Sequence, residues 1–206
     1  MSSAPETTKG TAVITEHLRA VSTGQLSDAM DRLALPRGGC YPVGPLHPGD
    51  KLVGRAFTVL FGRVLGRAPL HDYLTLAEPG DVLVLAAGGR TESAVWGGRR
   101  SMTARSRGFA GTVIDGLARD VEEHASVGYP VFCLGRSPLR SQGVIGAVAT
   151  GIPVGFAGLA VFPGDWIVGD ASGVMVLPSA RIDEIVDTAA AIAAAERATS
   201  PENFAG

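Results

Sequence analysis

Residues 111–123 read GTVIDGLARDVEE and join an apolar run to a charged end. The run 111–115 is typical of a buried strand, and a glycine follows it. Arg119 and Asp120 then form an Arg-Asp pair where the apolar residues end. About one helix length earlier stands a glycine turn, Gly97-Gly98-Arg99-Arg100. If the two segments meet in space, they supply backbone donors, one fixed cation and several carboxylates to a common site.

The pattern outward from this stretch predicts a single α/β domain over residues 13–206, with residues 1–12 as a flexible tail. Ser22 or Thr23 is expected to cap a helix, and a loop covers 36–51. Strands are expected at 52–60, 82–85, 111–115 and 130–134, and helical segments at 71–77, 94–107 and 120–127. Residues 61–70 are expected to be an exposed connection. Five short strands follow, at 144–148, 152–156, 159–161, 166–168 and 174–177. A final helix is expected after residue 179.

Composition limits the possible partners of the chain. Charged residues make up 18% of the 206, below the usual quarter. Either a surface partly buried against other subunits or apolar loops would give this low fraction. The net charge of −2 gives no drive toward nucleic acid or an anionic membrane. Two cysteines make no disulfide framework, and Cys133 is expected to be a small buried hydrophobe. With neither a signal peptide nor an apolar stretch of 18 residues, the cytoplasm is the expected location.

The glycine turn is a candidate anion site. Two glycines before a helix leave backbone N–H groups unpaired, and the helix dipole adds attraction for a carboxylate or phosphate. The turn lacks the Lys-Ser/Thr end of a phosphate-binding P-loop and the third glycine of the dinucleotide fingerprint. A tight turn without a ligand remains the alternative, with Arg99 and Arg100 in solvent or against a neighbouring subunit.

The second segment is a candidate metal site. Its carboxylates suit Mg²⁺ or Mn²⁺, which need few protein ligands, and lie at Asp115, Asp120, Glu122 and Glu123. Arg119 offers a planar donor fork to an oxyanion. In a helical 120–123, Asp120 and Glu123 would share a face. The alternative is a helix N-terminus decorated with acids that favour its dipole. No zinc spacing or hydrolase triad occurs, and His124 is expected at the surface rather than supporting the site.

Five stretches, in this order, resemble the 4-hydroxy-4-methyl-2-oxoglutarate aldolase family. That family also contains the regulator of ribonuclease activity A and proteins labelled demethylmenaquinone methyltransferase-like. The stretches lie at residues 54–59, 79–84, 94–98, 108–120 and 163–174. The resemblance runs from about residue 20 to 178. It implies a β/β/α swivelling-type fold with mixed sheets and helices at both ends. It also implies a homotrimer or a hexamer (a dimer of trimers) with its active site at the subunit interface.

Carried onto this chain, the resemblance implies specific roles. The backbone of Gly97, Gly98, Arg99 and Arg100 binds the substrate carboxylate, and Arg119 contacts the pyruvyl oxygens. Asp120 holds the divalent metal, Mg²⁺ or Mn²⁺, and Glu123 supports it through water. A neighbouring subunit supplies one more acid, for which Asp170 and Glu184 are both candidates. Glycine followed by two arginines at 98–100 departs from the family pattern, which often has an acid and then apolar residues.

The leading hypothesis is a metal-dependent (class II) aldolase acting on a small keto-acid. It cleaves a 4-hydroxy-2-oxo-dicarboxylate, such as 4-hydroxy-4-methyl-2-oxoglutarate, to pyruvate, with oxaloacetate decarboxylation as a side activity. Arg119 and Asp120 are the expected catalytic residues, and Arg119 and the metal stabilise the enolate. The alternative is a non-catalytic protein that regulates a ribonuclease by protein contact. Methyl transfer to a quinone is disfavoured, because no glycine-rich nucleotide loop with the expected acid follows a strand.

Overall fold

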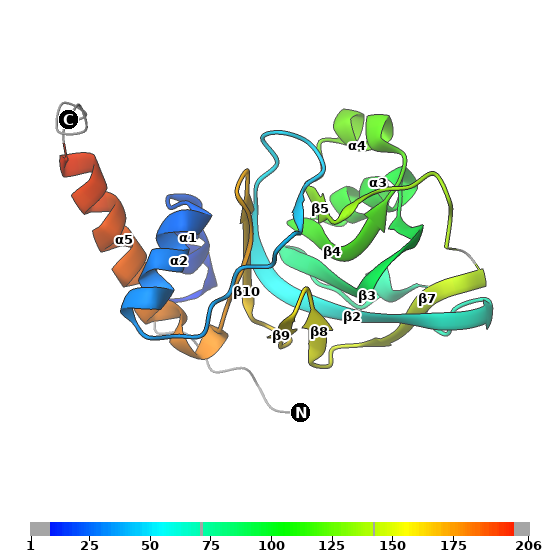
Figure 1. Cartoon of the computed structure of the whole chain (residues 1–206), viewed down its shortest axis with the longest axis horizontal. Helices are drawn as coiled ribbons and strands as arrows, with labels where there is room; N and C mark the ends of the chain where they lie inside the picture. The colour runs from blue at the N-terminus through cyan, green and yellow to red at the C-terminus, as the bar shows by residue number, and fades with distance from the viewer. Residues whose placement is uncertain (1–8, 71, 142, 200–206) are drawn as a thin grey trace.

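A mixed sheet of nine strands organises the computed structural model, which describes residues 9–70, 72–141 and 143–199 (Figure 1). The strand order is β1-β5-β4-β3-β2-β10-β11, with β6 beside β4 and β7 beside β2. The first strands are β1 (Gly44–Pro45), β2 (Leu52–Gly66), β3 (Asp81–Trp96), β4 (Gly111–Ala118), β5 (Val131–Cys133) and β6 (Gly135–Arg136). The later ones are β7 (Gly143–Thr150), β10 (Trp166–Asp170) and β11 (Gly173–Leu177). Strands β8 (Val154–Phe156) and β9 (Leu159–Val161) form a separate hairpin.

The centre of the sheet is parallel and buried on both faces. Strands β2, β3, β4 and β5 run parallel, connected by the 3-10 turn η1 (Tyr73–Thr75), helix α3 (Gly98–Ser106) and helix α4 (Val121–Val127). All eight residues of β4 are buried, as expected for a strand covered on both sides. The buried cores include Leu85 and Ile114 in one cluster, and Phe132 with Phe156 of β8 in another. The predicted alternation of strands and helices is confirmed from β3 to β5, where α3 and α4 connect the strands.

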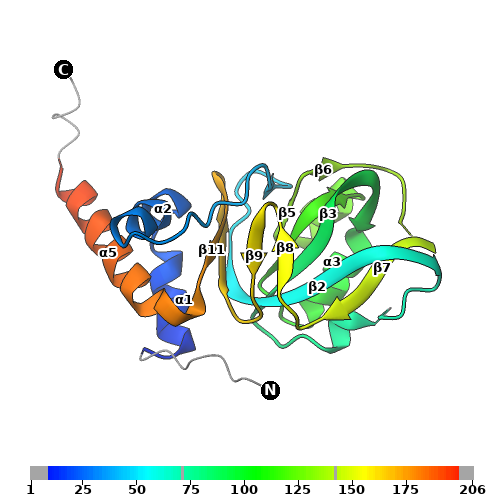
Figure 2. The same ribbon diagram turned by 60° about the horizontal axis from the view of Figure 1, so that its bottom comes forward.

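Helices from both ends of the chain form a separate layer on the antiparallel part of the sheet (Figures 1 and 2). They are α1 (Thr11–Arg19), α2 (Thr23–Arg32) and α5 (Ile182–Ala198). Ser22 begins α2 with a capping box shared with Gln25. The apolar face predicted for the last helix is buried as expected, at Ile182, Ile185, Val186, Ala189 and Ile192. The mixed α/β fold with helices at both ends is thus confirmed.

Five boundary predictions were wrong. The loop expected over 36–51 contains the short strand β1, which pairs with β5. Helix α1 begins at Thr11, inside the segment expected to be a tail, of which residues 1–8 lie outside the described residues. Strand β2 continues through 61–66, expected to be an exposed connection, because β7 pairs with it there. The helix expected over 71–77 is only the turn η1, and residue 71 is not described. The helix expected from 94 begins at Gly98, because 94–96 complete β3.

Within the described ranges, the helices are all too short or too polar to cross a bilayer.

We expect the Asp170 carboxylate to hold the helical layer onto the sheet. It accepts hydrogen bonds from the N–H and Oγ1–H of Thr23, at 2.9 and 2.8 Å, and from the N–H of Ser172 at 2.9 Å. Burial alone would raise the pKa of Asp170, but these hydrogen bonds outweigh it and lower the pKa below its usual 3.8. Because the carboxylate is partly exposed, Asp170→Asn should reduce the free energy of unfolding by only about 1–2 kcal/mol at pH 7.

The pH dependence has a defined sign. The lowered pKa contributes stability above the unfolded-state pKa, and this contribution is lost as the pH falls through the folded-state value. Urea unfolding of the native protein and Asp170→Asn should therefore converge in acid. A stability difference that widens below pH 4 would contradict this account.

Candidate functional site

The candidate site lies where two neighbouring parallel strands end. Strands β3 and β4 are in regular register from Val82 opposite Gly111 to Leu85 opposite Ile114. After an excursion in β3, Trp96 again pairs with Ala118, and the Arg119 N–H donates to the Trp96 carbonyl at 3.0 Å. The glycine turn and the Arg-Asp pair follow these last paired residues. They therefore emerge side by side at the carboxyl edge of the sheet, where ligands bind in open α/β sheets.

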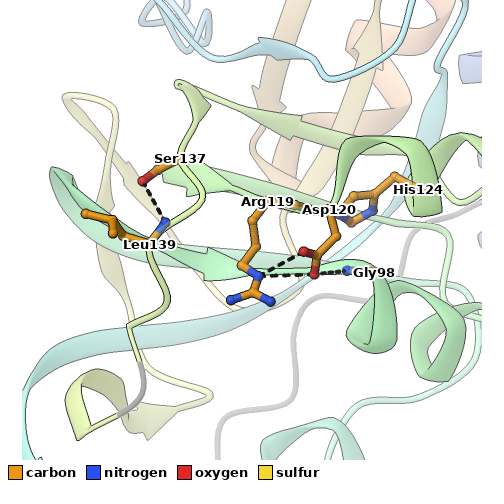
Figure 3. A network of polar contacts seen from close by, with 6 residues as sticks. All are labelled: Gly98, Arg119, Asp120, His124, Ser137 and Leu139. Carbon is orange, nitrogen blue, oxygen red and sulfur yellow. Dashed lines mark hydrogen bonds and ion pairs between the residues drawn. The ribbon is translucent and has the colours of Figure 1, made fainter.

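The two sequence segments are in direct contact. The Gly98 N–H donates to Asp120 Oδ2 at 3.2 Å (Figure 3). The Arg119 Nε donates to both oxygens of the same carboxylate, at 3.0 and 3.1 Å. The two terminal nitrogens of Arg119 point away from Asp120 and make no hydrogen bond with any described residue. Arg119 therefore orients Asp120 while keeping both terminal nitrogens for another anion.

Both glycines are required by close approach rather than by backbone conformation. A Cβ on Gly97 would lie 2.6 Å from Asp120 Oδ2. A Cβ on Gly98 would lie 2.1 Å from Glu123 Oε2 and 2.6 Å from Glu123 Cβ. A Cβ essentially never lies this close to a non-bonded atom, so glycine lets the strand end reach the two acids.

Asp120 does not belong to the helix that was expected to carry it. Helix α4 begins at Val121, and Asp120 precedes it in the left-handed region, with φ 61° and ψ 48°. That conformation costs a non-glycine residue about 1–2 kcal/mol. Its carboxylate does not cap α4 and instead turns to Gly98 and Arg119. The expected shared helical face is thus wrong, but Asp120 and Glu123 still flank the same residue, Gly98.

The carboxylates of Asp120 and Glu123 suit a divalent metal that keeps most of its waters better than one bound by protein ligands alone. The described residues contain no cluster of three or more His, Cys, Asp or Glu able to hold a metal. Two oxygen ligands beside a partly exposed turn are the kind of partial coordination that Mg²⁺ accepts, since it keeps several waters. Asp120 and Glu123 are the residues able to supply it. Glu122 is exposed on α4 and makes no contact that points to a role in the site.

Three other acids that the sequence offered serve elsewhere. Asp115 is buried, and its carboxylate accepts hydrogen bonds from the N–H groups of Ala87, Gly88 and Ala157, which fixes the β3 excursion. Burial raises the pKa of Asp115. Glu184 is paired with Arg181 at 2.6 Å, and Asp170 is bonded to Thr23. Neither Asp170 nor Glu184 lines the pocket beside Arg119 in its own chain.

A pocket of about 1090 Å³ opens beside Arg119 and Asp120. Among the residues that the structure describes, six arginines line it but only two acids, Asp72 and Asp120. The arginines are Arg67, Arg99, Arg100, Arg107, Arg119 and Arg140. Arg100 donates to the Tyr73 hydroxyl at 2.6 Å and thereby supports the wall. The exposed guanidinium of Arg99 has no partner among the described residues. The excess of positive charge favours an anionic ligand.

Comparison with known proteins identifies the family of this chain. Residues 23–176 match the model of the RraA-like family, described as aldolase/RraA. The chain belongs to the RraA-like family.

Individual relatives in this family differ in their named activity. A Halalkalibacterium halodurans protein named "putative 4-hydroxy-4-methyl-2-oxoglutarate aldolase" is 34% identical over 171 residues, or 83% of this chain and 79% of that protein. The crystal structure of Streptomyces coelicolor RraAS2, "an unusual member of the RNase ES inhibitor RraA protein family", is 29% identical. It superposes with a TM-score of 0.84 over 96% of this chain and 98% of that one. Legionella pneumophila DlpA is 31% identical over 83% of this chain, which spans only 28% of DlpA.

In this RraA-like protein, sequence reasoning missed the position of His124. The prediction of a surface histidine was wrong, because the side chain is 1% exposed and contacts both Ser101 and the Arg119 carbonyl. Burial lowers its pKa and favours the neutral ring. No local pattern in the sequence indicates this burial, because a histidine among acids normally faces water. Cys133 is buried, as expected.

Adding one methyl group at Gly98 should damage this site. In Gly98→Ala the new Cβ meets Glu123 Cβ, which cannot move without shifting α4, so we expect a loss of about 1–3 kcal/mol in unfolding free energy. The matched control is Gly24→Ala, also in the first turn of a helix, where the nearest atom to the new Cβ is Ser22 Oγ at 3.7 Å. This control should be neutral or stabilising by up to about 1 kcal/mol. Equal effects in chemical denaturation would show that the close approach is not needed.

Proposed function

We propose that this RraA-like protein is a divalent-metal-dependent carbon–carbon lyase that forms pyruvate. Its substrate would be a 4-hydroxy-2-oxo-dicarboxylate such as 4-hydroxy-4-methyl-2-oxoglutarate, with oxaloacetate decarboxylation as a side activity. One observation carries the proposal: the glycine turn and the Arg119–Asp120 pair meet at the mouth of an arginine-lined pocket. The naming of the Halalkalibacterium relative supports the same reaction class.

The residues present fit a metal of the Mg²⁺ or Mn²⁺ type. Asp120 would hold it directly, and Glu123 would do so through water. When bound, such an ion supplies Lewis-acid polarisation of the 2-keto oxygen. The chain itself orients the ligand, since Gly98 N–H and Arg119 Nε fix the Asp120 carboxylate.

The remaining groups suit the cleavage step. The Gly98 N–H already donates to Asp120, and the Arg100 N–H donates to the Gly97 carbonyl at 3.0 Å. The N–H groups of Gly97 and Arg99, at the positive end of α3, would therefore bind the C1 carboxylate. A water accepts the C4 hydroxyl proton, the C3–C4 bond breaks, and C4 becomes a carbonyl carbon. The electron pair of that bond passes into the pyruvate enolate, which is then protonated at C3. The free terminal nitrogens of Arg119 would stabilise the enolate oxygen.

Arg99 is the best candidate to bind the distal carboxylate of the substrate. It follows the glycine turn directly, lines the pocket and has no partner among the described residues. Arg100 is less suited to direct contact, because its guanidinium is engaged by Tyr73. The arginines that depart from the family pattern would therefore divide into one that binds substrate and one that supports the wall.

We also propose that the site is shared between copies of this chain, in a trimer or a dimer of trimers. The segment between β6 and β10 contributes lining residues to the pocket, among them Arg140 and Ile145, and carries five exposed apolar side chains. They are Leu139, Val144, Val148, Ile152 and Phe162. The low charged fraction of 18% is in keeping with such burial. A second subunit would then supply a further acid, from Asp170 or Glu184.

Regulation of a ribonuclease by protein contact is the competing function, and the name of the Streptomyces relative favours it. A regulator needs a surface rather than an oriented carboxylate and arginine, so it predicts no metal requirement and no turnover. An assay for metal-dependent release of pyruvate therefore distinguishes the two functions.

Purified protein should release pyruvate from 4-hydroxy-4-methyl-2-oxoglutarate and from oxaloacetate with Mg²⁺ or Mn²⁺, and EDTA should abolish the release. Arg119→Lys should lower kcat by about 100-fold or more, because a point charge cannot replace the donor fork. Asp120→Asn should lose the response to metal. A lactate dehydrogenase-coupled assay measures each rate, with metal alone as the blank for spontaneous oxaloacetate decay.

Arg105→Ala is the matched control, because Arg105 lies on the same helix α3 but outside the pocket lining. Its rate should equal that of the native protein. No pyruvate with either metal would reject the lyase and favour the regulator. Full activity in a species with the mass of one chain, 21.1 kDa by light scattering, would reject the shared site.

Removing the Arg99 guanidinium should weaken substrate binding more than chemistry. Arg99→Ala should raise KM for 4-hydroxy-4-methyl-2-oxoglutarate about five- to tenfold, the loss of about 1–1.4 kcal/mol for a partly exposed ion pair. Because the distal carboxylate is remote from the breaking bond, kcat should change little. Arg105→Ala again removes one positive charge from the same helix. Matching KM values in the two variants would show that only net charge matters.

A further inference from the structure

Three buried side chains form a continuous hydrogen-bonded chain behind the Arg119–Asp120 pair. Trp96 Nε1 donates to Ser101 Oγ at 2.8 Å, and Ser101 Oγ lies 2.7 Å from His124 Nδ1. His124 Nε2 lies 2.8 Å from the Arg119 carbonyl oxygen. Exposure is 1% for Trp96, 0% for Ser101 and 1% for His124. The chain crosses from β3 through α3 to α4, so it joins the three elements that build the site.

The chemistry of its two ends fixes the direction of every bond. A carbonyl oxygen only accepts, so His124 Nε2 carries the proton that it donates to Arg119. In the neutral ring Nδ1 is then an acceptor, and it takes the Ser101 hydroxyl proton. An indole N–H only donates, so Ser101 Oγ accepts from Trp96. Each polar group is therefore used, and reversing either internal bond would leave a buried group unpaired.

The end of this chain lies on the peptide that sets the direction of Asp120. The Arg119 carbonyl belongs to the peptide group preceding Asp120, whose backbone is left-handed at φ 61°. Fixing that carbonyl fixes the peptide plane, and with it the direction in which the Asp120 side chain leaves the backbone. On the other side, Gly98 N–H holds the carboxylate itself. Asp120 is thus held at its backbone through His124 and at its carboxylate by Gly98.

We propose that Ser101 and His124 are positioning residues. Ser101 holds His124 as its Nε2–H tautomer, and His124 thereby sets the geometry of Asp120 for binding a divalent metal. The metal part of this inference rests on the proposed function; the tautomer and the position of Asp120 do not. Neither side chain needs to touch substrate or metal. Groups that orient a metal ligand in this way commonly change metal affinity by about 10- to 100-fold when they are removed.

The test compares Ser101→Ala with a control that loses an equally buried hydrogen bond elsewhere in the same core. Tyr129→Phe is that control, since the Tyr129 hydroxyl bonds to Thr112 Oγ1 at 3.0 Å and its ring is stacked with Trp96. We expect both variants to lose thermal stability to a similar extent. Only Ser101→Ala should weaken binding of Mn²⁺ alone, measured by calorimetric titration, by about 10- to 100-fold.

Two readouts need no metal. In the native protein, imidazole ¹⁵N resonances should place the His124 proton on Nε2, with Nδ1 as an acceptor, and the resonance is assigned by its loss in His124→Asn. The Gly98 amide, which donates to Asp120, should exchange faster with solvent in Ser101→Ala than in Tyr129→Phe. Should Ser101→Ala fail to fold, Ser101→Cys keeps a weaker donor in a similar volume and should give a smaller change in the same direction.

The outcomes separate this inference from the proposed function. If the native protein binds no Mn²⁺ but the tautomer and the Gly98 effect are found, the positioning role stands and the metal-dependent function fails. A proton on Nδ1 would overturn the positioning role. So would equal Gly98 exchange in Ser101→Ala and Tyr129→Phe, even if Mn²⁺ binds.

Discussion

The arrangement of the site depends on one close approach, that of the Gly97–Gly98 backbone to the carboxylates of Asp120 and Glu123. The pairing of Trp96 with Ala118 brings the ends of β3 and β4 together, but a pair of strands only sets the spacing of backbones. The absence of side chains at 97 and 98 lets α3 begin against the start of α4. A larger residue at either position would push the start of α3 away from the start of α4. The backbone N–H groups would then lie farther from the two carboxylates. The Gly98 hydrogen bond, the orientation of Arg119 and the pocket mouth all follow from this contact.

The sequence predicts local features of this fold well and long-range features poorly. The apolar run of β4 and the apolar face of α5 are visible because their burial is periodic along the chain. The extension of β2 through residues 61–66 is not visible, because Gly62 and Arg63 indicate a loop until β7, about eighty residues later, pairs with them. The second half of β3 is hidden for a similar reason. Its course depends on Asp115, which binds the backbone of the excursion from the neighbouring strand.

The same limit applies to the site. Both of its segments stand out in the sequence, because glycine pairs and Arg-Asp pairs have recognisable chemistry. From the sequence alone, contact between the two segments was a condition for a common site and could not be predicted. The left-handed backbone of Asp120 and the burial of His124 left no local pattern, since an acid before a short helix normally caps it and a histidine among acids normally faces water. The overall charge of −2 likewise concealed a pocket with six arginines and two acids, because net charge does not report how charges are distributed.

The hydrogen-bonded chain behind Asp120 is better explained by specificity than by stability. A buried polar network gains little free energy over apolar side chains of the same shape, because each group is first removed from water. What the network adds is discrimination among geometries: a rotated His124 ring or a flipped Arg119 peptide would leave a donor or an acceptor unpaired. An apolar side chain at 124 would fill the space equally well and would leave the Arg119 carbonyl without this donor. Asp120 is held in an unfavourable backbone conformation, so the surrounding structure must hold it there. The chain from Trp96 to His124 reaches that peptide from the protein interior, while the Asp120 carboxylate, held by Gly98 and Arg119, lines the pocket.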